Sequence, residues 1–417
     1  MASTMSADAL PLFDDVPPAS EVARPELIKR SSSGEIIVGD ARKVLADFED
    51  GHFRTIVTSP PYWGLRDYGI EGQIGAEMEL DAYLRDLVAL FRECRRVLAN
   101  DGTFWLNIGD SFTSGGRTWR QTDSKNAARG MDYRAPTPPG LKPKDLIGVP
   151  WKLAFALQAD GWWLRSDIVW AKPNPMPESV TDRPTRSHEY LFLLTKSERY
   201  FYDAEAIKEE GVTHLRDPRY GPDAPGRDRH AEPWNQAAPY KPHSGFKSLD
   251  TTRGRNKRDV WIIATEPFPG AHFAVMPTAL VEPCVLAGTS PQACPTCGAP
   301  WDRVIERRST DRDDAGRTHG LAGQRMGKSA PPERGWETET ATVGFRPTCT
   351  CEGNDGAAQC VVLDPFGGSG TVASVAKRLG RSSVYIDANP KYADMARRRV
   401  AQTPSPPIPL FNEEAAE

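Results

Sequence analysis

The chain has 417 residues, of which 39% are hydrophobic and 26% charged, and its formal net charge is −4. This is the composition of an ordinary soluble globular protein, long enough for one large α/β domain with insertions or for two or three modest domains. No apolar run approaches the roughly 18–20 residues that a membrane-spanning helix needs, and no signal pattern opens the chain. We therefore expect a cytosolic (cytoplasmic) protein with no membrane partner.

The first half of the chain predicts strands that alternate with helices. Residues 1–32 are rich in Ala, Ser, Pro and acidic residues, and predict a mobile tail. After this tail the hydrophobic periodicity predicts strands at 35–40, 54–59 and 102–110 and helices at 41–50 and 80–99. A loop rich in Gly, Ser, Thr, Arg and Pro follows at 111–140.

The second half predicts two further strands and then long polar segments. We expect a helix at 149–161, strands at 163–172 and 187–196, and a helix at 276–288, whereas 203–258 and 289–358 are polar and poorly periodic. Regular pattern returns at the C-terminal end, with strands at 360–366 and 382–387 and helices at 372–380 and 389–400.

Strands that alternate with helices predict a mostly parallel sheet, and such sheets bind ligands at the carboxyl ends of their strands. Four of the predicted strands end in polar or glycine-rich sequence: Asp40, TSPPY (58–62), DPFGGSG (364–370) and Asp387. We expect all four to lie at one edge of the sheet.

The glycine turn and Asp387 together indicate a nucleoside-containing cofactor. The glycines of DPFGGSG lie between a buried strand and a helix, where the backbone can approach a ligand closely. The turn matches neither the phosphate-binding loop nor the full dinucleotide fingerprint. Asp387 ends the next strand, where a carboxylate accepts hydrogen bonds from ribose hydroxyls. The cofactor therefore needs no pyrophosphate.

The pair TSPPYW and DPFGGSGT, in this order, resembles the permuted (beta-type) site-specific DNA amino-methyltransferases, which act on cytosine N4 or adenine N6. The resemblance covers about 35–205 and 259–400. It implies a class I S-adenosylmethionine-dependent methyltransferase fold, with a Rossmann-like, mixed, mostly parallel seven-stranded sheet and helices on both faces. S-adenosylmethionine is the implied cofactor, and double-stranded DNA is the implied partner. A cognate restriction endonuclease is a second candidate partner. The protein would be a monomer or a homodimer.

The resemblance also assigns the cofactor-binding residues. Asp40 would contact the adenine, Asp364 would lie near the amino group of the cofactor, and Asp387 would bind the ribose. Phe366, Gly368 and Gly370 would form the turn.

The TSPPY corner suits methyl transfer to an exocyclic amine. The amine is a poor nucleophile because its lone pair is delocalised into the ring, and hydrogen bonds accepted from its NH₂ group localise that lone pair. Ser59 and Pro60 offer the acceptors, and Pro60 and Pro61 make the corner rigid. Tyr62 can stack on a base that has left the duplex. Either Tyr62 or Trp63 could also face the sulfonium of the cofactor. The alternative is a plain proline-rich turn.

Ser59 favours cytosine N4, because the resembled family more typically has Ser before Pro-Pro-Tyr in cytosine enzymes and Asp or Asn in adenine enzymes. Adenine N6 is the alternative of the same fold. An RNA or protein-amide methyltransferase, and an inactive zinc-ribbon nucleic-acid-binding protein, are the other hypotheses. A carbon-5 cytosine enzyme would need a cysteine nucleophile, but Pro283-Cys284 lies in an apolar helical segment, and we interpret Cys284 as a core residue.

Two close cysteine pairs, Cys294 with Cys297 and Cys349 with Cys351, predict a tetrahedral structural zinc site. A redox pair at Cys294 and Cys297 is the alternative. The other cysteines, Cys94, Cys284 and Cys360, have apolar neighbours and predict core positions.

Target recognition must come from outside the sheet, through cations that bind phosphates and side chains that reach base edges. One candidate is 111–145, and the other is 203–258, which we favour. The cations are Arg117, Arg120, Lys125 and Arg129 in the first and Arg253, Arg255, Lys257 and Arg258 in the second. The predicted organisation is a tail (1–32), the catalytic half (33–202), the recognition insertion (203–258), a cofactor-half helix (259–290), a zinc-ribbon or flexible insertion (291–355), the cofactor-binding half (356–402) and a second tail (403–417).

Overall fold

The computed structural model describes residues 34–113, 135–209, 254–268, 275–310 and 337–406. The chain divides into two compact units. The larger unit comprises residues 1–206, 258–302 and 346–417, and the smaller comprises 207–257 and 303–345. Among the described helices, none combines the length and the apolar character needed to cross a membrane.

The larger unit is built on a sheet of eight strands in the order β1-β10-β9-β2-β3-β5-β4-β6. Described neighbours run parallel except at β5, which is antiparallel to both β3 and β4. The expected seven strands are therefore one too few. The strands are β1 (Glu35–Val38), β2 (Phe53–Thr58), β3 (Leu98–Ile108), β4 (Trp163–Ala171), β5 (His188–Thr195), β6 (Val260–Ile262), β9 (Val361–Asp364) and β10 (Ser382–Asp387).

The missed strand is β6, which pairs with β4 at the end of the sheet. Only Trp261 of its three residues is buried. A strand this short has too few residues to establish a period of two, and the basic stretch before it obscures the pattern.

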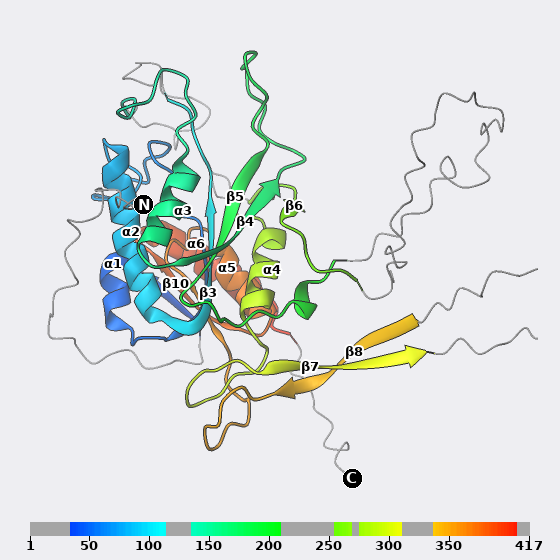
Figure 1. Cartoon of the computed structure of the whole chain (residues 1–417). Helices are drawn as coiled ribbons and strands as arrows, with labels where there is room; N and C mark the ends of the chain where they lie inside the picture. The colour runs from blue at the N-terminus through cyan, green and yellow to red at the C-terminus, as the bar shows by residue number, and fades with distance from the viewer. Residues whose placement is uncertain (1–33, 114–134, 210–253, 269–274, 311–336, 407–417) are drawn as a thin grey trace, which may run out of the picture. The chain divides into compact units, whose positions relative to one another are not determined.

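Helices cover both faces of the sheet, as the resemblance implied (Figure 1). The view shows α1, α2 and α3 on one side and α4 and α5 on the other, and α6 packs against α5 and β1. The helices are α1 (Ala41–Val44), α2 (Leu80–Val97), α3 (Val149–Ala159), α4 (Thr278–Gly288), α5 (Thr371–Arg378) and α6 (Pro390–Gln402), with short 3-10 turns at Leu45–Asp47 and Glu205–Ile207.

A strand from the first part of the sequence and a strand from the last part pair in the middle of the sheet. Strand β9, near the C-terminal end, pairs in parallel with β2, with Thr55 opposite Val362 and Ile56 opposite Leu363. The same junction carries a side-chain hydrogen bond from Thr58 to Asp364 at 2.6 Å. The sequence halves that hold TSPPY and DPFGGSG are thus neighbouring strands of one sheet.

The start of β3 differs from the expectation, because helix α2 ends at Val97 and the strand begins at Leu98 rather than at residue 102. The pairing with β2 shifts register between Phe53 and Thr55, and this irregularity takes up the extra residues. Gly102 lies within it, where an added Cβ would come 2.6 Å from a Leu98 methyl carbon.

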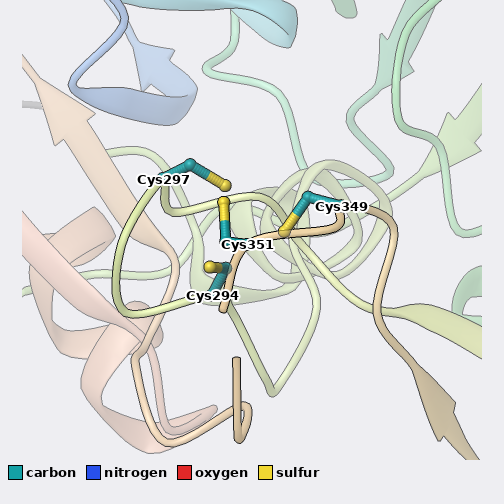
Figure 2. A group of neighbouring side chains, drawn as sticks. All are labelled: Cys294, Cys297, Cys349 and Cys351. Carbon is teal, nitrogen blue, oxygen red and sulfur yellow. The ribbon is translucent and has the colours of Figure 1, made fainter. Parts of the chain in front are cut away.

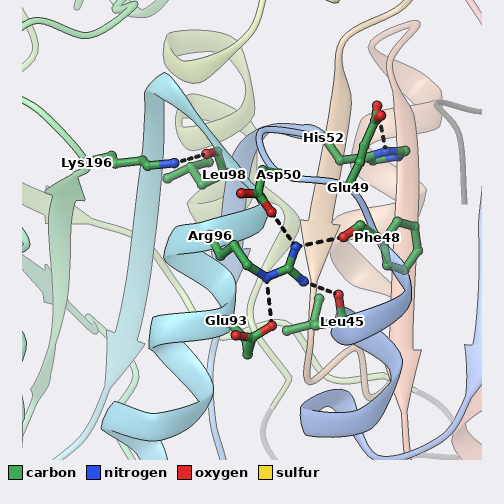
Figure 3. A network of polar contacts seen from close by, with 9 residues as sticks. All are labelled: Leu45, Phe48, Glu49, Asp50, His52, Glu93, Arg96, Leu98 and Lys196. Carbon is green, nitrogen blue, oxygen red and sulfur yellow. Dashed lines mark hydrogen bonds and ion pairs between the residues drawn. The ribbon is translucent and has the colours of Figure 1, made fainter. Parts of the chain in front are cut away.

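Arg96 ties the end of α2 to the segment that precedes β2 (Figure 3). Its guanidinium donates to the carbonyls of Leu45 and Phe48 at 2.7 and 2.8 Å and pairs with Asp50 and Glu93. Cations favour the carbonyl ends of helical turns. These contacts fix the 45–52 segment. The ten-residue helix expected at 41–50 is replaced by α1 and a 3-10 turn.

Strands β7 (Asp302–Thr310) and β8 (Glu337–Arg346) form a separate two-stranded sheet. The sequence predicted a zinc-ribbon or flexible insertion here, without this pair of strands. Charged residues in the two segments obscure the alternation of apolar and polar residues that identifies a strand. In sequence, one cysteine pair precedes β7 and the other follows β8.

Candidate active site

A cavity of about 320 Å³ lies at the carboxyl ends of the strands. The four polar strand ends that the sequence singled out all line it, so the predicted convergence on one edge is confirmed. The predicted site residues in its wall are Asp40, Ser59, Pro60, Pro61, Tyr62, Asp364, Phe366, Gly368 and Asp387. Gly370 is the one predicted cofactor residue that does not line it.

The Pro-Pro-Tyr corner after β2 is held in place from behind. The Tyr83 hydroxyl of helix α2 donates to the Pro61 carbonyl at 2.9 Å. The Trp63 indole donates to the Glu77 carbonyl at 2.9 Å, and the Trp63 side chain is only 5% exposed, within the core. The alternative in which Trp63 faces the cofactor is therefore wrong, and Tyr62 is the ring of this corner at the cavity.

Neighbouring residues hold both the ring edge and the hydroxyl of Tyr62 in place. The hydroxyl donates to Glu189 Oε2 at 2.7 Å. Gly109 leaves room for the ring, since a Cβ there would come 2.7 Å from Tyr62 Cε2. Burial raises the pKa of the phenol well above its ordinary value, and the charge of Glu189 raises it further. Tyr62 therefore stays protonated and keeps one orientation.

Asp364, at the end of β9, is a buried carboxyl that resists ionisation. Burial raises its pKa to about 7, although hydrogen bonds from Thr58 and from the Phe366 backbone lower it. Those bonds are 2.6 Å and 3.2 Å long, and the side chain is 3% exposed. A ligand donor at this carboxyl would favour its charged form.

Two glycines of the turn are required by close packing. A Cβ at Gly367 would lie 2.0 Å from the Tyr385 ring, and one at Gly370 would lie 2.7 Å from the Ala396 side chain. Gly370 also has a φ of 77° and is the N-cap of α5. Its role is thus to pack α5 against α6, whereas Gly368 is the predicted glycine in the cavity wall.

Asp387 at the end of β10 accepts backbone hydrogen bonds from Gly368 at 2.9 Å and from Asn389 at 2.8 Å. Burial raises its pKa, while these two bonds lower it. Each carboxylate oxygen has two lone pairs, so one acceptor position on each remains for a ligand hydroxyl.

Asp40 lines the cavity and is also the N-cap of α1, accepting from the Arg42 backbone N–H at 3.0 Å. The Arg42 guanidinium donates to both of its carboxylate oxygens. Burial opposes ionisation, but the hydrogen bonds and charge of Arg42 leave the pKa of Asp40 below its ordinary value. Asp40 is therefore ionised and held in a fixed position.

The sequence reasoning missed several cavity residues on β3, β4 and β5. Lys172 directly follows β4, while Glu189 lies at the start of β5, and the two side chains form an ion pair. Asn107 on β3 donates to Glu189 at 3.3 Å. A signal was present, because the polar pair His188-Glu189 precedes the buried run of β5. Tyr68 and Tyr392 also line the cavity, with ring centroids 6.3 Å apart.

The four cysteines of the predicted metal site gather in the larger unit (Figure 2). Their sulfur atoms all lie within 4.8 Å of one another. The first pair forms a knuckle in which the Gly298 N–H donates to the Cys294 carbonyl at 2.8 Å. The remaining cysteines, Cys94, Cys284 and Cys360, are buried as expected, and Cys284 lies inside α4.

The structure describes only part of the predicted DNA-binding region. Arg253 lies outside the described residues, as do Arg117, Arg120, Lys125 and Arg129. In the smaller unit, Arg255 and Lys257 both pair with Glu209, at 3.0 and 4.0 Å. Arg258 belongs to the larger unit, where its carbonyl accepts from the Trp261 indole at 2.6 Å.

Comparison with known proteins finds a match to the model of the DNA methylase family over residues 53–294 and 358–398. The chain is 45% identical to the Type II methyltransferase M.SmaI of Serratia marcescens, over 88% of this chain and 91% of that protein. It is 44% identical to the Type II methyltransferase M.Cfr9I of Citrobacter freundii, over 87% of this chain and 86% of that protein. The solved structure of the PvuII DNA methyltransferase (cytosine-N4-specific) aligns with 89% of this chain and 87% of its own, with 14% identity and a TM-score of 0.48.

Proposed function

The chain belongs to the N6/N4 DNA methylase family, and from that premise we propose that it transfers a methyl group from S-adenosylmethionine to the exocyclic N4 amine of a flipped-out cytosine in double-stranded DNA. The observation that carries the proposal is one cavity lined by both the Ser59-Pro60-Pro61-Tyr62 corner and the glycine turn.

The corner supplies the acceptors for the amine. The Pro61 carbonyl already accepts from Tyr83, so Ser59 Oγ and the Pro60 carbonyl are the two acceptors assigned to the NH₂ group. They localise the nitrogen lone pair, and the fixed corner needs no reorganisation during the reaction. As the N–C bond forms, the S–C bond breaks and its electron pair stays on sulfur, and the methylated amine then releases a proton to solvent water. Tyr62 stacks on the extruded base.

The cofactor half of the cavity supplies the remaining contacts. S-adenosylmethionine brings an activated methyl group on a sulfonium. The ribose hydroxyls would use the open acceptor positions of Asp387, and the amino group of the cofactor would donate near Asp364. Asp40 would contact the adenine, and Phe366 would form the turn with Gly368.

Cytosine is preferred because Ser, rather than Asp or Asn, precedes Pro-Pro-Tyr; adenine N6 is the alternative. The test is to incubate the protein with labelled S-adenosylmethionine and plasmid DNA, digest the DNA to nucleosides and identify the product by mass. N4-methylcytosine supports the proposal, and N6-methyladenine moves it to the alternative. A label found only in RNA or protein, or no label at all, refutes it.

Two variants test the assigned roles. Ser59→Ala and Tyr62→Ala should each lower turnover roughly tenfold to a hundredfold, since positioning errors of about 1 Å cost up to 10²-fold. Ser197→Ala is the matched control, because its hydroxyl donates to the Asn100 carbonyl outside the cavity. Full activity of Tyr62→Ala would refute the stacking role.

The similarity to Type II methyltransferases supports a role beside a cognate restriction endonuclease. We assign recognition of the target sequence to residues 203–258. Sequencing of the modified DNA should then place the methyl groups in one short, defined sequence. Methylation without any sequence preference would contradict this part of the proposal.

We also propose that Cys294, Cys297, Cys349 and Cys351 hold one structural zinc ion, because four thiolates at these spacings suit tetrahedral coordination. Elemental analysis of the purified protein should give about one zinc per chain. Cys294→Ser should lose this zinc and lower the unfolding temperature, whereas the core variant Cys284→Ser should retain it. A metal-free protein with a disulfide between Cys294 and Cys297 would favour the redox alternative.

A further inference from the structure

A cluster of charged and polar side chains in the cavity wall surrounds the Tyr62 hydroxyl, and its other members have no role in the proposed reaction. Glu189 is its centre. Glu189 Oε2 accepts from the Tyr62 hydroxyl at 2.7 Å and from Asn107 Nδ2 at 3.3 Å, and Oε1 accepts from Lys172 Nζ. All four residues line the cavity.

Glu189 is a holding group rather than an acceptor for the substrate amine. Three protein donors already converge on its carboxylate. Its contact with the corner is the hydrogen bond from the Tyr62 hydroxyl. A carboxyl group with such partners is costly to redirect, because each lost hydrogen bond leaves a polar group in the cavity wall without its partner. Glu189 therefore fixes Tyr62 and Lys172.

Lys172 has donors to spare. Its ammonium carries three N–H donors, and Glu189 is the hydrogen-bond acceptor that the described residues provide for it. The Trp170 ring lies 4.2 Å from Nζ, measured to the ring centroid, and restricts the side chain further. Only 14% of the side chain is exposed, so water alone is a poor substitute for a partner. The unused donors lie at the cavity wall.

We propose that Lys172 is a specificity-determining residue that donates a hydrogen bond to the C2 carbonyl oxygen (O2) of the extruded cytosine. This inference rests on the proposed cytosine-N4 activity. The Watson–Crick edge of cytosine presents its amine, then N3, then O2, whereas adenine has only a C–H group where cytosine has O2. With the amine at Ser59 and Pro60, the far end of this edge needs a donor. Adenine would leave the remaining N–H donors of the Lys172 ammonium without an acceptor, and a site built to hydrogen-bond a substrate group discriminates strongly against a base without it.

The test uses duplexes that contain either cytosine or 2-thiocytosine at the target position, because sulfur is a weak hydrogen-bond acceptor. For the wild-type protein, kcat/KM should fall roughly tenfold to a hundredfold on the thio substrate, the range expected for losing a hydrogen bond to a charged group. For Lys172→Met, kcat/KM on cytosine should fall by a similar factor. For this variant, kcat/KM on the two substrates should differ by less than about threefold, because the substitution and the sulfur atom remove the same hydrogen bond.

Two further variants separate specificity from stability. Lys172→Gln keeps an N–H donor and should restore part of the discrimination against 2-thiocytosine. Lys196→Met removes a half-buried lysine that donates to the Leu98 carbonyl, and it should leave the discrimination unchanged. If Lys172→Met retains the wild-type discrimination, or Lys172→Gln abolishes it as fully as Met does, the proposal is overturned. A wild-type product of N6-methyladenine would instead refute the proposed cytosine activity, which the nucleoside analysis detects separately.

Discussion

Replacing Asp364 with asparagine should stabilise the ligand-free protein, and by more at pH 8 than at pH 5.5. Burial raises the pKa of Asp364 from 3.8 to about 7, and the side chain is 3% exposed. Because the folded-state pKa is the higher one, the stability that this group contributes is fully present below pH 3.8 and is lost as the pH rises through 7. Asparagine removes the titration while keeping an oxygen that can accept from Thr58 and Phe366.

The expected size follows from the two pKa values. Relative to low pH, the protein loses roughly 4 kcal/mol of stability at pH 8, where the folded-state carboxyl is charged, at about 1.4 kcal/mol for each tenfold change in the ionisation constant. At pH 5.5 it loses about 2 kcal/mol, because the carboxyl is protonated in the folded state but ionised in the unfolded chain. The free energy of unfolding of Asp364→Asn, relative to wild type, should therefore increase by about 2 kcal/mol between these two pH values.

The assay is urea unfolding followed by tryptophan fluorescence at both pH values. Asp182→Asn is the control, because the hydrogen bond from Lys144 lowers the pKa of Asp182 below 3.8, so this variant should differ from wild type by the same amount at both pH values. The reasoning would be refuted if Asp364→Asn and wild type differed in the free energy of unfolding by the same amount at both pH values, or by less at pH 8.

Two other substitutions test the neighbours of these groups. Thr58→Val removes the hydrogen bond to Asp364 and should cost roughly 1–3 kcal/mol in the free energy of unfolding, more at pH 8 than at pH 5.5, since the bond favours the charged carboxylate; an equal cost at both pH values would contradict this. Gly109→Ala places a Cβ 2.7 Å from the Tyr62 ring and should lower the single-turnover methylation rate roughly tenfold to a hundredfold, because the ring must move. Gly344→Ala is the control, because nothing lies within 4 Å of the added Cβ, and it should leave both the methylation rate and the stability unchanged. An equal loss of rate in both variants would show that the contact between residue 109 and the Tyr62 ring is not the cause.

The sequence by itself determined seven strands of the large sheet, the main helices and the site residues that follow strand ends. A buried strand requires a run of apolar residues, so the polar sequences after β1, β2, β9 and β10 were visible as interruptions. Parallel strands share one carboxyl edge, and Asp40, Tyr62 and Asp387 could therefore be assigned to one site without a structure. Cysteine spacing likewise predicted a cluster that the fold brings together.

Only the tertiary structure decided which other side chains reach that site. Lys172 directly follows β4 and Glu189 lies at the start of β5, and these two strands pair antiparallel. Nothing local in the sequence indicates that Glu189 accepts a hydrogen bond from Tyr62. The roles of Gly370 and Trp63 were also decided by packing, because both positions meet residues distant in sequence. Hydrophobic periodicity records which face of an element is buried, whereas the partner that covers that face depends on the pairing order of the whole sheet.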